Sequence, residues 1–282
     1  MAPQGKTRAD AGWALEIALD VEWAHAVAPK ADILLVETRS NGLNNLFAGI
    51  DYAAQHGASV ISNSWGSSEY NGEAGYDASC NLAAAVCTFA SGDAGNPGLY
   101  GAYNPGVISV GGTSLSLSAA GAVVSESGWI GSGGGVSQYE SAPGYQTTYK
   151  GGAYSFAGRA IPDVSYDADP GTGFAVYDSV AYNSQSGWFQ LGGTSAGTPQ
   201  WAAIVAVADQ ERGAAGKGRL SAAGLQANSA LYSLAGTGSM FDVAYGSNGS
   251  CGDVCTAAAG YDAVTGIGSP RAGIDAALAA RP

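Results

Sequence analysis

The chain has 282 residues, of which 46% are hydrophobic and only 12% are charged, and its formal net charge is −12 at pH 7. A chain of this length buries one sizeable core, so we expect a single domain over residues 1–282. An acidic surface repels nucleic acid and anionic membranes, and no apolar run approaches the roughly 20 residues that span a bilayer. Nucleic acid and membrane are therefore excluded as partners. Such a surface suits low pH, because protonating carboxylates relieves self-repulsion.

The four cysteines form two close pairs in the sequence, Cys80 with Cys87 and Cys251 with Cys255. This layout suits local disulfides in an oxidising compartment, with buried free thiols as the alternative. We therefore expect at least one disulfide and a secreted protein. The first residues lack a charged start followed by an apolar stretch, so we expect no signal peptide and a fragment that begins inside a longer precursor.

The first half of the chain alternates between helical and strand patterns. Apolar residues from Trp13 onward recur at helical spacing until Pro29 ends the run. In chain order we predict a helix over 13–28, a strand over 33–36, a helix over 43–56, a strand over 60–64, a helix over 76–85, and strands over 87–90 and 107–110. This alternation requires right-handed crossovers and a parallel sheet with helices on both faces, so the fold class is α/β.

After about residue 115 the pattern becomes hairpin-like and rich in glycine. We predict strands over 122–125, 173–177 and 188–191. A helix over 199–210 then follows Gly192-Gly193-Thr194-Ser195.

Ser195 lies between a predicted strand and a helix with Pro199 in its first turn. A serine at this junction presents its hydroxyl at the positive end of a helix dipole, where an anionic intermediate is favoured. A Gly-Ser turn that caps the helix explains the segment equally well. The segment also matches the Gly-x-Ser-x-Gly elbow of α/β-hydrolases, but those enzymes need a histidine after the serine. No histidine follows His56.

A histidine base is hard to place elsewhere in the chain. A triad of the subtilisin type needs a histidine that opens a helix, whereas His56 closes a predicted helix, where a positive charge is favourable. His25 lies inside the first helix and is interpreted as a packed or exposed helix residue. A serine nucleophile therefore needs another base.

Glu16 and Asp20 supply such a base, because residues four apart lie on one face of a helix. Two close carboxylates repel each other unless they share a proton. The pair therefore titrates in two coupled steps, and the pKa of one step is raised. One carboxylate can then accept a serine proton while the other orients it. A solvated acidic face, which Glu22 would join, is the alternative.

Asp93 directly follows a strand of the predicted parallel sheet, where ligands of such folds gather. A carboxylic acid held neutral there can donate a hydrogen bond to an oxyanion. A turn aspartate that caps its own backbone explains the residue without any catalytic role.

Five segments of the chain, in this order, resemble the sedolisin, or serine-carboxyl, peptidase family, which has a subtilisin-like fold. They are Glu16-Ile17-Ala18-Leu19-Asp20 with Ala28-Pro29, Ile61-Ser62-Asn63-Ser64-Trp65-Gly66, Ala90-Ser91-Gly92-Asp93, Gly192-Gly193-Thr194-Ser195 with Pro199, and Gly260-Tyr261-Asp262 with Thr265-Gly266-Ile267-Gly268.

The resemblance implies that Ser195 is the nucleophile, Glu16 its general base, Asp20 the partner that orients Glu16, and Asp93 the oxyanion donor. The implied activity is that of a secreted endopeptidase that cleaves proteins at acidic pH through an acyl-enzyme. The implied architecture is a three-layer domain with a mainly parallel sheet. Family domains carry a strand before the Glu-to-Asp helix, so we expect an N-terminal strand and the propeptide to be missing.

The resemblance also implies substrate-binding residues. Trp65 is similar to a tryptophan that lines the family's cleft, although a core position explains it equally well. Ser132, Gly133, Gly134 and Gly135 look like the family's substrate-binding strand, where missing side chains let a peptide pair along an edge. A nucleotide-binding glycine loop is the alternative, but no lysine or following helix supports it.

The C-terminal match implies one structural calcium ion in the segment 240–270. Its ligands are the carboxylates of Asp242 and Asp262 and the carbonyls of Val243, Ala258 and Gly260, an oxygen-only set that suits a hard cation. Ala258-Ala259 replaces the Gly-Pro more usual in the family. A turn-rich terminal segment explains the same residues without a metal.

Two other functions fit the sequence. One is a truncated, non-catalytic relative that only binds peptides, and the other is a histidine-dependent serine hydrolase. The reading that unites the five segments is a monomeric peptidase that acts on polypeptide substrates.

Overall fold

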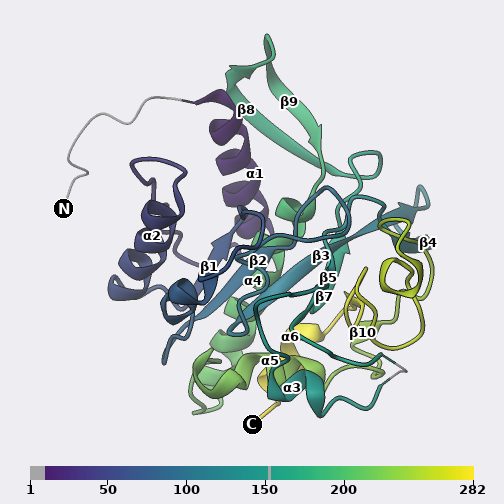
Figure 1. Ribbon diagram of the computed structural model, residues 1–282. Helices are drawn as coiled ribbons and strands as arrows, with labels where there is room; N and C mark the ends of the chain where they lie inside the picture. Colours follow the sequence, from purple (N-terminus) through teal and green to yellow (C-terminus); the bar gives the residue numbers. More distant parts are fainter. Residues whose placement is uncertain (1–9, 152–153) are drawn as a thin grey trace.

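The computed structural model describes residues 10–151 and 154–282, which form a three-layer α/β domain (Figure 1). In the central sheet β1, β2, β3 and β7 are parallel and lie in that order, and β4 pairs antiparallel with the second half of β3. The strands are β1 (Val60–Asn63), β2 (Val86–Ala90), β3 (Val107–Leu117), β4 (Val123–Gly128) and β7 (Val164–Asp167). The predicted fold class is confirmed.

The sheet buries both of its faces against helices. In β2, Val86 belongs to the core cluster that includes α4 (Thr194–Ala214), and Thr88 donates a hydrogen bond to the Thr198 carbonyl at 3.3 Å. Phe89 belongs to the opposite cluster, which includes α2 (Leu43–Gln55). Successive side chains of a strand point to opposite faces, so α2 and α4 cover different faces of the sheet. A strand buried on both faces explains the continuous apolar run of β2.

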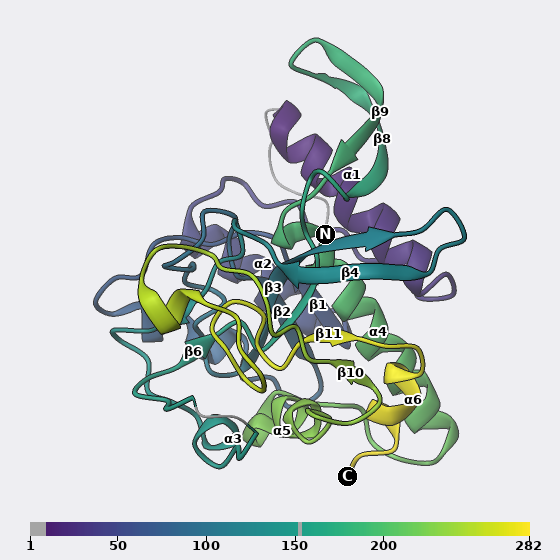
Figure 2. The same ribbon diagram turned by 90° about the vertical axis from the view of Figure 1, so that its right-hand side faces the viewer.

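Helix α1 (Ala11–Val27) lies on the α4 side of the sheet. The Asp10 side chain caps it by accepting hydrogen bonds from the next backbone amides, and the helix ends before Pro29, as predicted. Leu15 and Leu19 pack with Ala196 of α4 and with Val176. Val176 belongs to the hairpin of β8 (Phe174–Tyr182) and β9 (Gln185–Leu191), which projects beside α1 (Figures 1 and 2).

Shorter elements complete the domain below and beside the sheet (Figure 2). They are η1 (Glu73–Ser79), β5 (Gly135–Val136), α3 (Gly144–Thr147), β6 (Ala160–Ile161), η2 (Ala223–Leu225), α5 (Gln226–Tyr232), β10 (Met240–Phe241), η3 (Gly252–Cys255), β11 (Ser269–Pro270) and α6 (Ile274–Ala279). The Cys251 and Cys255 sulfurs lie at disulfide-bond distance, in line with the expectation of at least one disulfide, whereas Cys80 and Cys87 are buried free thiols. Within the described ranges, no helix combines the length and apolar character needed to cross a membrane.

Two predicted elements are wrong. Residues 33–36 form no strand, and Ile33, Leu34 and Leu35 are 44%, 48% and 50% exposed. Their apolar pattern has no partner among the described strands, because β1 pairs only with β2. The helix predicted over 76–85 is a 3₁₀ turn that ends at Ser79. Beyond that turn, the Leu82 and Ala85 carbonyls accept hydrogen bonds from the Ala223 and Ala222 amides at 3.1 and 3.0 Å, so residues 82–85 pair with a distant segment.

Candidate active site

Ser195 is the second residue of α4, which begins five residues earlier than predicted. Gly193 precedes the helix with φ 98° and ψ 158°, a conformation that glycine adopts readily. Pro199 therefore lies inside the helix rather than in its first turn. It lacks the N–H that would bond the Ser195 carbonyl, and the Ser64 hydroxyl donates to that carbonyl at 3.5 Å. The helix start thus leaves the Ser195 side chain at the positive end of the helix dipole.

Glu16 and Asp20 of α1 approach this helix start. Burial raises the pKa of Glu16, a hydrogen bond with the Ser195 side chain lowers it, and the negative charge of Asp93 raises it. The Glu16 atom Oε1 is buried and has no hydrogen-bond partner among the described residues. The predicted nucleophile Ser195 and the predicted oxyanion donor Asp93 are therefore within interaction range of the carboxyl group of Glu16, the predicted base.

Asp20 is held by a residue that the sequence analysis did not single out as functional. The Ser64 hydroxyl donates a hydrogen bond of 2.7 Å to the Asp20 carboxylate. Burial and the negative charge of Glu16 raise the pKa of Asp20 well above its usual value, while the Ser64 hydrogen bond lowers it. Ser64 directly follows β1, and its position at the carboxyl end of a parallel strand is the signal that would have found it.

Asp93 follows β2 and is fixed by the first residue of α4. Its Oδ1 accepts hydrogen bonds from the Thr194 amide at 2.7 Å and the Thr194 hydroxyl at 2.9 Å. The same hydroxyl accepts a bond from the Gly92 amide at 3.1 Å. A Cβ on Gly193 would lie 2.7 Å from Asp93 Oδ2, and its positive φ of 98° also favours glycine at this position. Thr194 is a second functional residue that sequence reasoning missed.

The histidines lie in other settings. His56 caps the end of α2, its Nδ1 lies 2.8 Å from the Tyr52 carbonyl, and its ring stacks on Tyr52 at 3.8 Å. His25 lies in the last turn of α1 and is exposed. The charged groups that shift the pKa of Glu16 and Asp20 are all acidic. This environment favours carboxylate chemistry over a histidine base.

The residues predicted to bind substrate differ in burial: Trp65 is half-buried, whereas residues 132–135 are buried. Trp65 follows Ser64 and is half-buried, with its ring edge-on to Phe47 at 5.2 Å and to Phe89 at 4.9 Å. Part of the Trp65 ring therefore packs against the core, as expected if Trp65 is a core residue rather than one that lines a cleft.

Ser132, Gly133, Gly134 and Gly135 are fully buried, and their polar groups already have partners. The Gly133 amide bonds the Gly92 carbonyl at 2.7 Å, and the Gly134 carbonyl accepts the Gly98 amide at 3.0 Å. These glycines pack closely against the backbone of residues 91–92 and 263, and their role in binding substrate stays a prediction.

The five predicted calcium ligands lie in one loop region. Asp242 accepts a hydrogen bond from the Gly260 amide at 2.8 Å, and Asp262 accepts one from the Ala258 amide at 3.0 Å. The Val243 carbonyl accepts the Thr265 hydroxyl at 3.2 Å. Burial raises the pKa of Asp262 to about 6. Within the described ranges, no group of three or more His, Cys, Asp or Glu side chains is arranged to hold a metal, so carbonyl oxygens would have to complete any site.

Comparison with known proteins agrees with this geometry. Residues 10–250 match the family described as the subtilase family. Kumamolisin from Bacillus sp. (strain MN-32) is 32% identical over 288 residues, which cover 90% of this chain and 49% of that protein. Sedolisin from Pseudomonas sp. (strain 101) is 34% identical over 179 residues, which cover 60% of this chain and 28% of that protein.

A solved structure supports the same relationship. The structure described as Pseudomonas sedolisin (serine-carboxyl proteinase) complexed with two molecules of pseudo-iodotyrostatin aligns with a TM-score of 0.78 and 27% identity. The alignment covers 99% of this chain and 81% of that one. The chain spans about half the length of Kumamolisin and less than a third of Sedolisin.

Proposed function

The chain belongs to the subtilase family and, within it, to the sedolisins, and from that premise we propose that it is the catalytic domain of a secreted serine-carboxyl endopeptidase. The observation that carries this proposal is that Glu16 interacts with Ser195, with Asp20 and with Asp93. Three acidic groups around one serine hydroxyl supply a base, a partner for that base and an acid. The Cys251–Cys255 disulfide supports an extracellular location.

In the proposed reaction, the Ser195 oxygen attacks the scissile carbonyl while Glu16 takes the serine proton. Asp20, held by Ser64, shares a proton with Glu16 and so stabilises the charge that moves through the pair. Asp93 in its acid form donates a hydrogen bond to the oxyanion. The tetrahedral intermediate then expels the amine, which takes the proton from Glu16, and water releases the acyl group by the same steps in reverse.

The proposed substrates are polypeptides, and the proposed working pH is acidic. Asp93 must carry a proton to donate to the oxyanion, while the Glu16 and Asp20 pair must keep one negative charge to accept the serine proton. The raised pKa of each member of the pair means that one proton is retained well above the usual range of carboxyl groups. The acidic surface and the proton shared by Glu16 and Asp20 support an acidic working pH.

Cleavage of a denatured protein from about pH 3 to 8 tests this function. We expect activity confined to acid, and a loss of about 10³-fold or more in Ser195→Ala and in Glu16→Gln, because removing a member of such a unit has that effect. His56→Ala is the matched control and should keep full activity. Loss of activity in His56→Ala would refute the carboxylate mechanism, and peptide binding without cleavage would support the non-catalytic alternative.

We also propose one structural calcium ion in the segment 240–270. The donor set suits calcium, because two carboxylates and neighbouring carbonyls lie in the same loop region. A bound cation would also stabilise the charged form of Asp262, whose pKa is raised by burial. Calcium should raise Tm, a chelator should reverse the rise, and Asp242→Asn should abolish the response. An unchanged Tm and no metal by elemental analysis would remove the proposal.

A further inference from the structure

The segments that follow β1 and β2 carry two glycines at the same level beyond the sheet. The two strands are parallel neighbours, and the last pair in their register is Asn63 with Phe89. Gly66 and Gly92 each come three residues after that pair, so they lie opposite each other at the carboxyl edge of the sheet. Ligands of α/β folds gather at this edge. The space between the two residues is called the glycine gap below.

The two segments also contact the candidate active site. The Ser64 hydroxyl donates to the Ser195 carbonyl at 3.5 Å. The Gly92 amide donates to the Thr194 hydroxyl at 3.1 Å, and the residue after Gly92 is Asp93, the predicted oxyanion donor. The glycine gap therefore lies beside the residues that would hold a scissile carbonyl.

The Leu99 side chain fills the glycine gap. A Cβ placed on Gly66 would lie 2.8 Å from Leu99 Cβ and 3.3 Å from its Cδ1. A Cβ placed on Gly92 would lie 2.9 Å from Leu99 Cγ and 3.2 Å from its Cδ1. Gly66 is exposed and Leu99 is half-buried, so the gap lies at the protein surface. Its two walls are bare backbone, and one leucine side chain lies between them.

Backbone hydrogen bonds hold Leu99 in this position. Its amide donates to the Ser91 carbonyl at 2.9 Å, on the β2 side of the gap. On the β1 side, the Tyr100 amide donates to the Ser67 carbonyl at 2.7 Å, and the Ser67 amide donates to the Tyr100 carbonyl at 3.1 Å. The backbone around Leu99 is therefore fixed to both walls, so the size of its side chain sets how much of the gap is left.

The gap lies on the acyl side of the proposed reaction. Glu16 returns its proton to the leaving amine, so the amine side of the substrate lies toward Glu16 on α1. The carbonyl oxygen points toward Asp93, directly after Gly92. The direction past Gly92 and toward Gly66 is left to the side chain of the acyl residue, which is the substrate residue that supplies the scissile carbonyl.

We propose that Leu99 is a specificity-determining residue, which restricts the acyl residue to the small side chains of Gly, Ala and Ser. A larger side chain would need the volume that Leu99 holds between Gly66 and Gly92. Closely packed groups between two fixed backbones do not yield to extra methylenes without strain. The inference rests on the proposed function, because it concerns the substrate of that same site.

Two peptide substrates that differ only at the acyl residue test the inference. One carries Ala and the other Phe, and kcat/KM for cleavage at that bond is measured at the pH of highest activity, with the products identified by mass spectrometry. We expect the unchanged protein to prefer the Ala peptide by about 100-fold, because a pocket discriminates even a single methylene by 10–200-fold. In Leu99→Gly this preference should fall at least tenfold, because cleavage of the Phe peptide increases.

A second truncation and a matched control sharpen the test. Leu99→Ala should lower the preference by an intermediate factor, and it keeps the test decisive if Leu99→Gly does not fold. Leu117→Ala removes the same atoms from a leucine of β3 that is 52% exposed, so it should keep the preference of the unchanged protein.

The inference is overturned if the unchanged protein cleaves both peptides equally well, or if the Leu99 variants keep its preference. Cleavage in either case would still uphold the proposed function. If the unchanged protein cleaves neither peptide, isothermal titration compares their affinities. Binding of the Ala peptide at least tenfold more tightly, with that difference lost in Leu99→Gly, would uphold the size limit and count against the peptidase. Equal binding or no binding would overturn the inference.

Discussion

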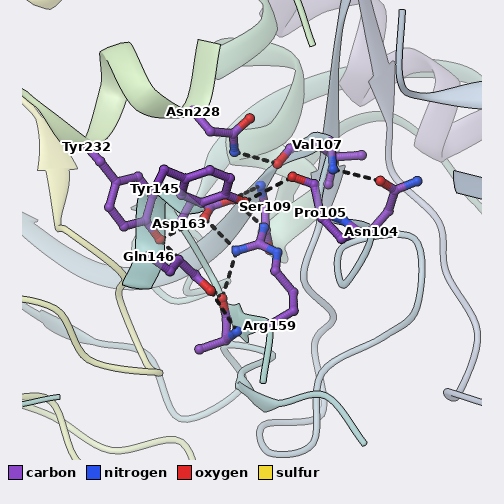
Figure 3. Close-up of polar contacts among 12 residues, drawn as sticks. Asn104, Pro105, Val107, Ser109, Tyr145, Gln146, Arg159, Asp163, Asn228 and Tyr232 are labelled. Carbon is purple, nitrogen blue, oxygen red and sulfur yellow. Dashed lines mark hydrogen bonds and ion pairs between the residues drawn. The ribbon is translucent and has the colours of Figure 1, made fainter. Parts of the chain in front are cut away.

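Two buried acidic sites of this protein differ in the charged groups that surround their carboxylates. Asp163 is fully buried and forms a two-pronged ion pair with Arg159, with nitrogen-to-oxygen distances of 2.7 and 2.6 Å (Figure 3). It also accepts hydrogen bonds from the Tyr232 hydroxyl and the Ser109 amide, each at 2.8 Å. Glu16 and Asp20 instead face each other and Asp93, and their pKa values are raised.

The difference separates a carboxylate that holds the fold together from carboxylates that can exchange a proton. A buried carboxylate that is paired with a cation and hydrogen-bonded on both oxygens is costly to disturb. Buried acidic groups that repel one another share a proton, and a shared proton can move during a reaction. Breaking the first site should therefore cost stability, whereas neutralising part of the second should cost activity and add stability.

The largest effect is expected for Arg159→Met. This change leaves Asp163 buried without its cation, and we expect a loss of about 3–5 kcal/mol in the free energy of unfolding. Urea denaturation at pH 5 measures the loss. Arg271→Met is the control, because Arg271 is exposed and lies over the Phe241 ring at 5.0 Å, so its loss should stay below about 1 kcal/mol.

A second variant separates the ion pair from the packing of the arginine side chain. Arg159→Met combined with Asp163→Leu removes both charges and should regain part of the lost stability. If the double variant is as unstable as the sum of two single losses, the pairing is not what stabilises this region.

The same spacing of four residues shows what sequence can and cannot predict. Glu16 and Asp20 were predicted to act together because helical spacing places residues four apart on one face, and α1 confirms that spacing. Arg159 and Asp163 are also four residues apart, but they flank the short strand β6, where no local rule brings them together. Their pairing depends on tertiary contacts with α3, α5 and β3, which a single sequence does not supply.

The misplaced elements have the same cause. Parallel strands were recognisable from apolar runs, and Gly192-Gly193 marked the approach to α4, although the predicted helix start at 199 was five residues late. Residues 33–36 carry a strand pattern, but a strand needs a partner, and the described part of the chain offers none. Ser64 and Thr194 were missed because their roles depend on which loops meet at the carboxyl ends of β1 and β2.

The second prediction is a gain of stability from Asp20→Asn together with loss of peptidase activity. The pKa of Asp20 is raised in the folded protein, so its charged form opposes folding once the pH exceeds the unfolded value. The variant should gain about 0.5–2 kcal/mol at pH 7, the usual range of single stabilising changes. The gain should vanish near pH 3, where the unfolded chain is also protonated. A loss of stability at pH 7 would contradict the interpretation that the charged form of Asp20 opposes folding.

The smallest effect concerns a third acidic cluster, which contains Glu73 and Glu140. Burial is the main cause that raises the pKa of Glu73 to about 8 and that of Glu140 to about 7, from a usual value of 4.5. Glu69 lies close enough to raise both further, Glu73 Oε1 has no hydrogen-bond partner among the described residues, and Oε2 accepts the Tyr70 amide at 2.8 Å.

Because these folded-state pKa values are raised, the folded protein binds more protons than the unfolded chain, and stability falls as the pH rises from about 4.5 to 8. Glu73→Gln keeps an acceptor for the Tyr70 amide and removes the charge, so it should raise Tm at pH 8 by about 2–4 °C and leave Tm at pH 4 unchanged. The exposed Asp253, changed to Asn, should alter neither value. If Glu73→Gln shifts Tm equally at both pH values, the effect is one of packing, and protonation of this cluster does not contribute to stability in acid.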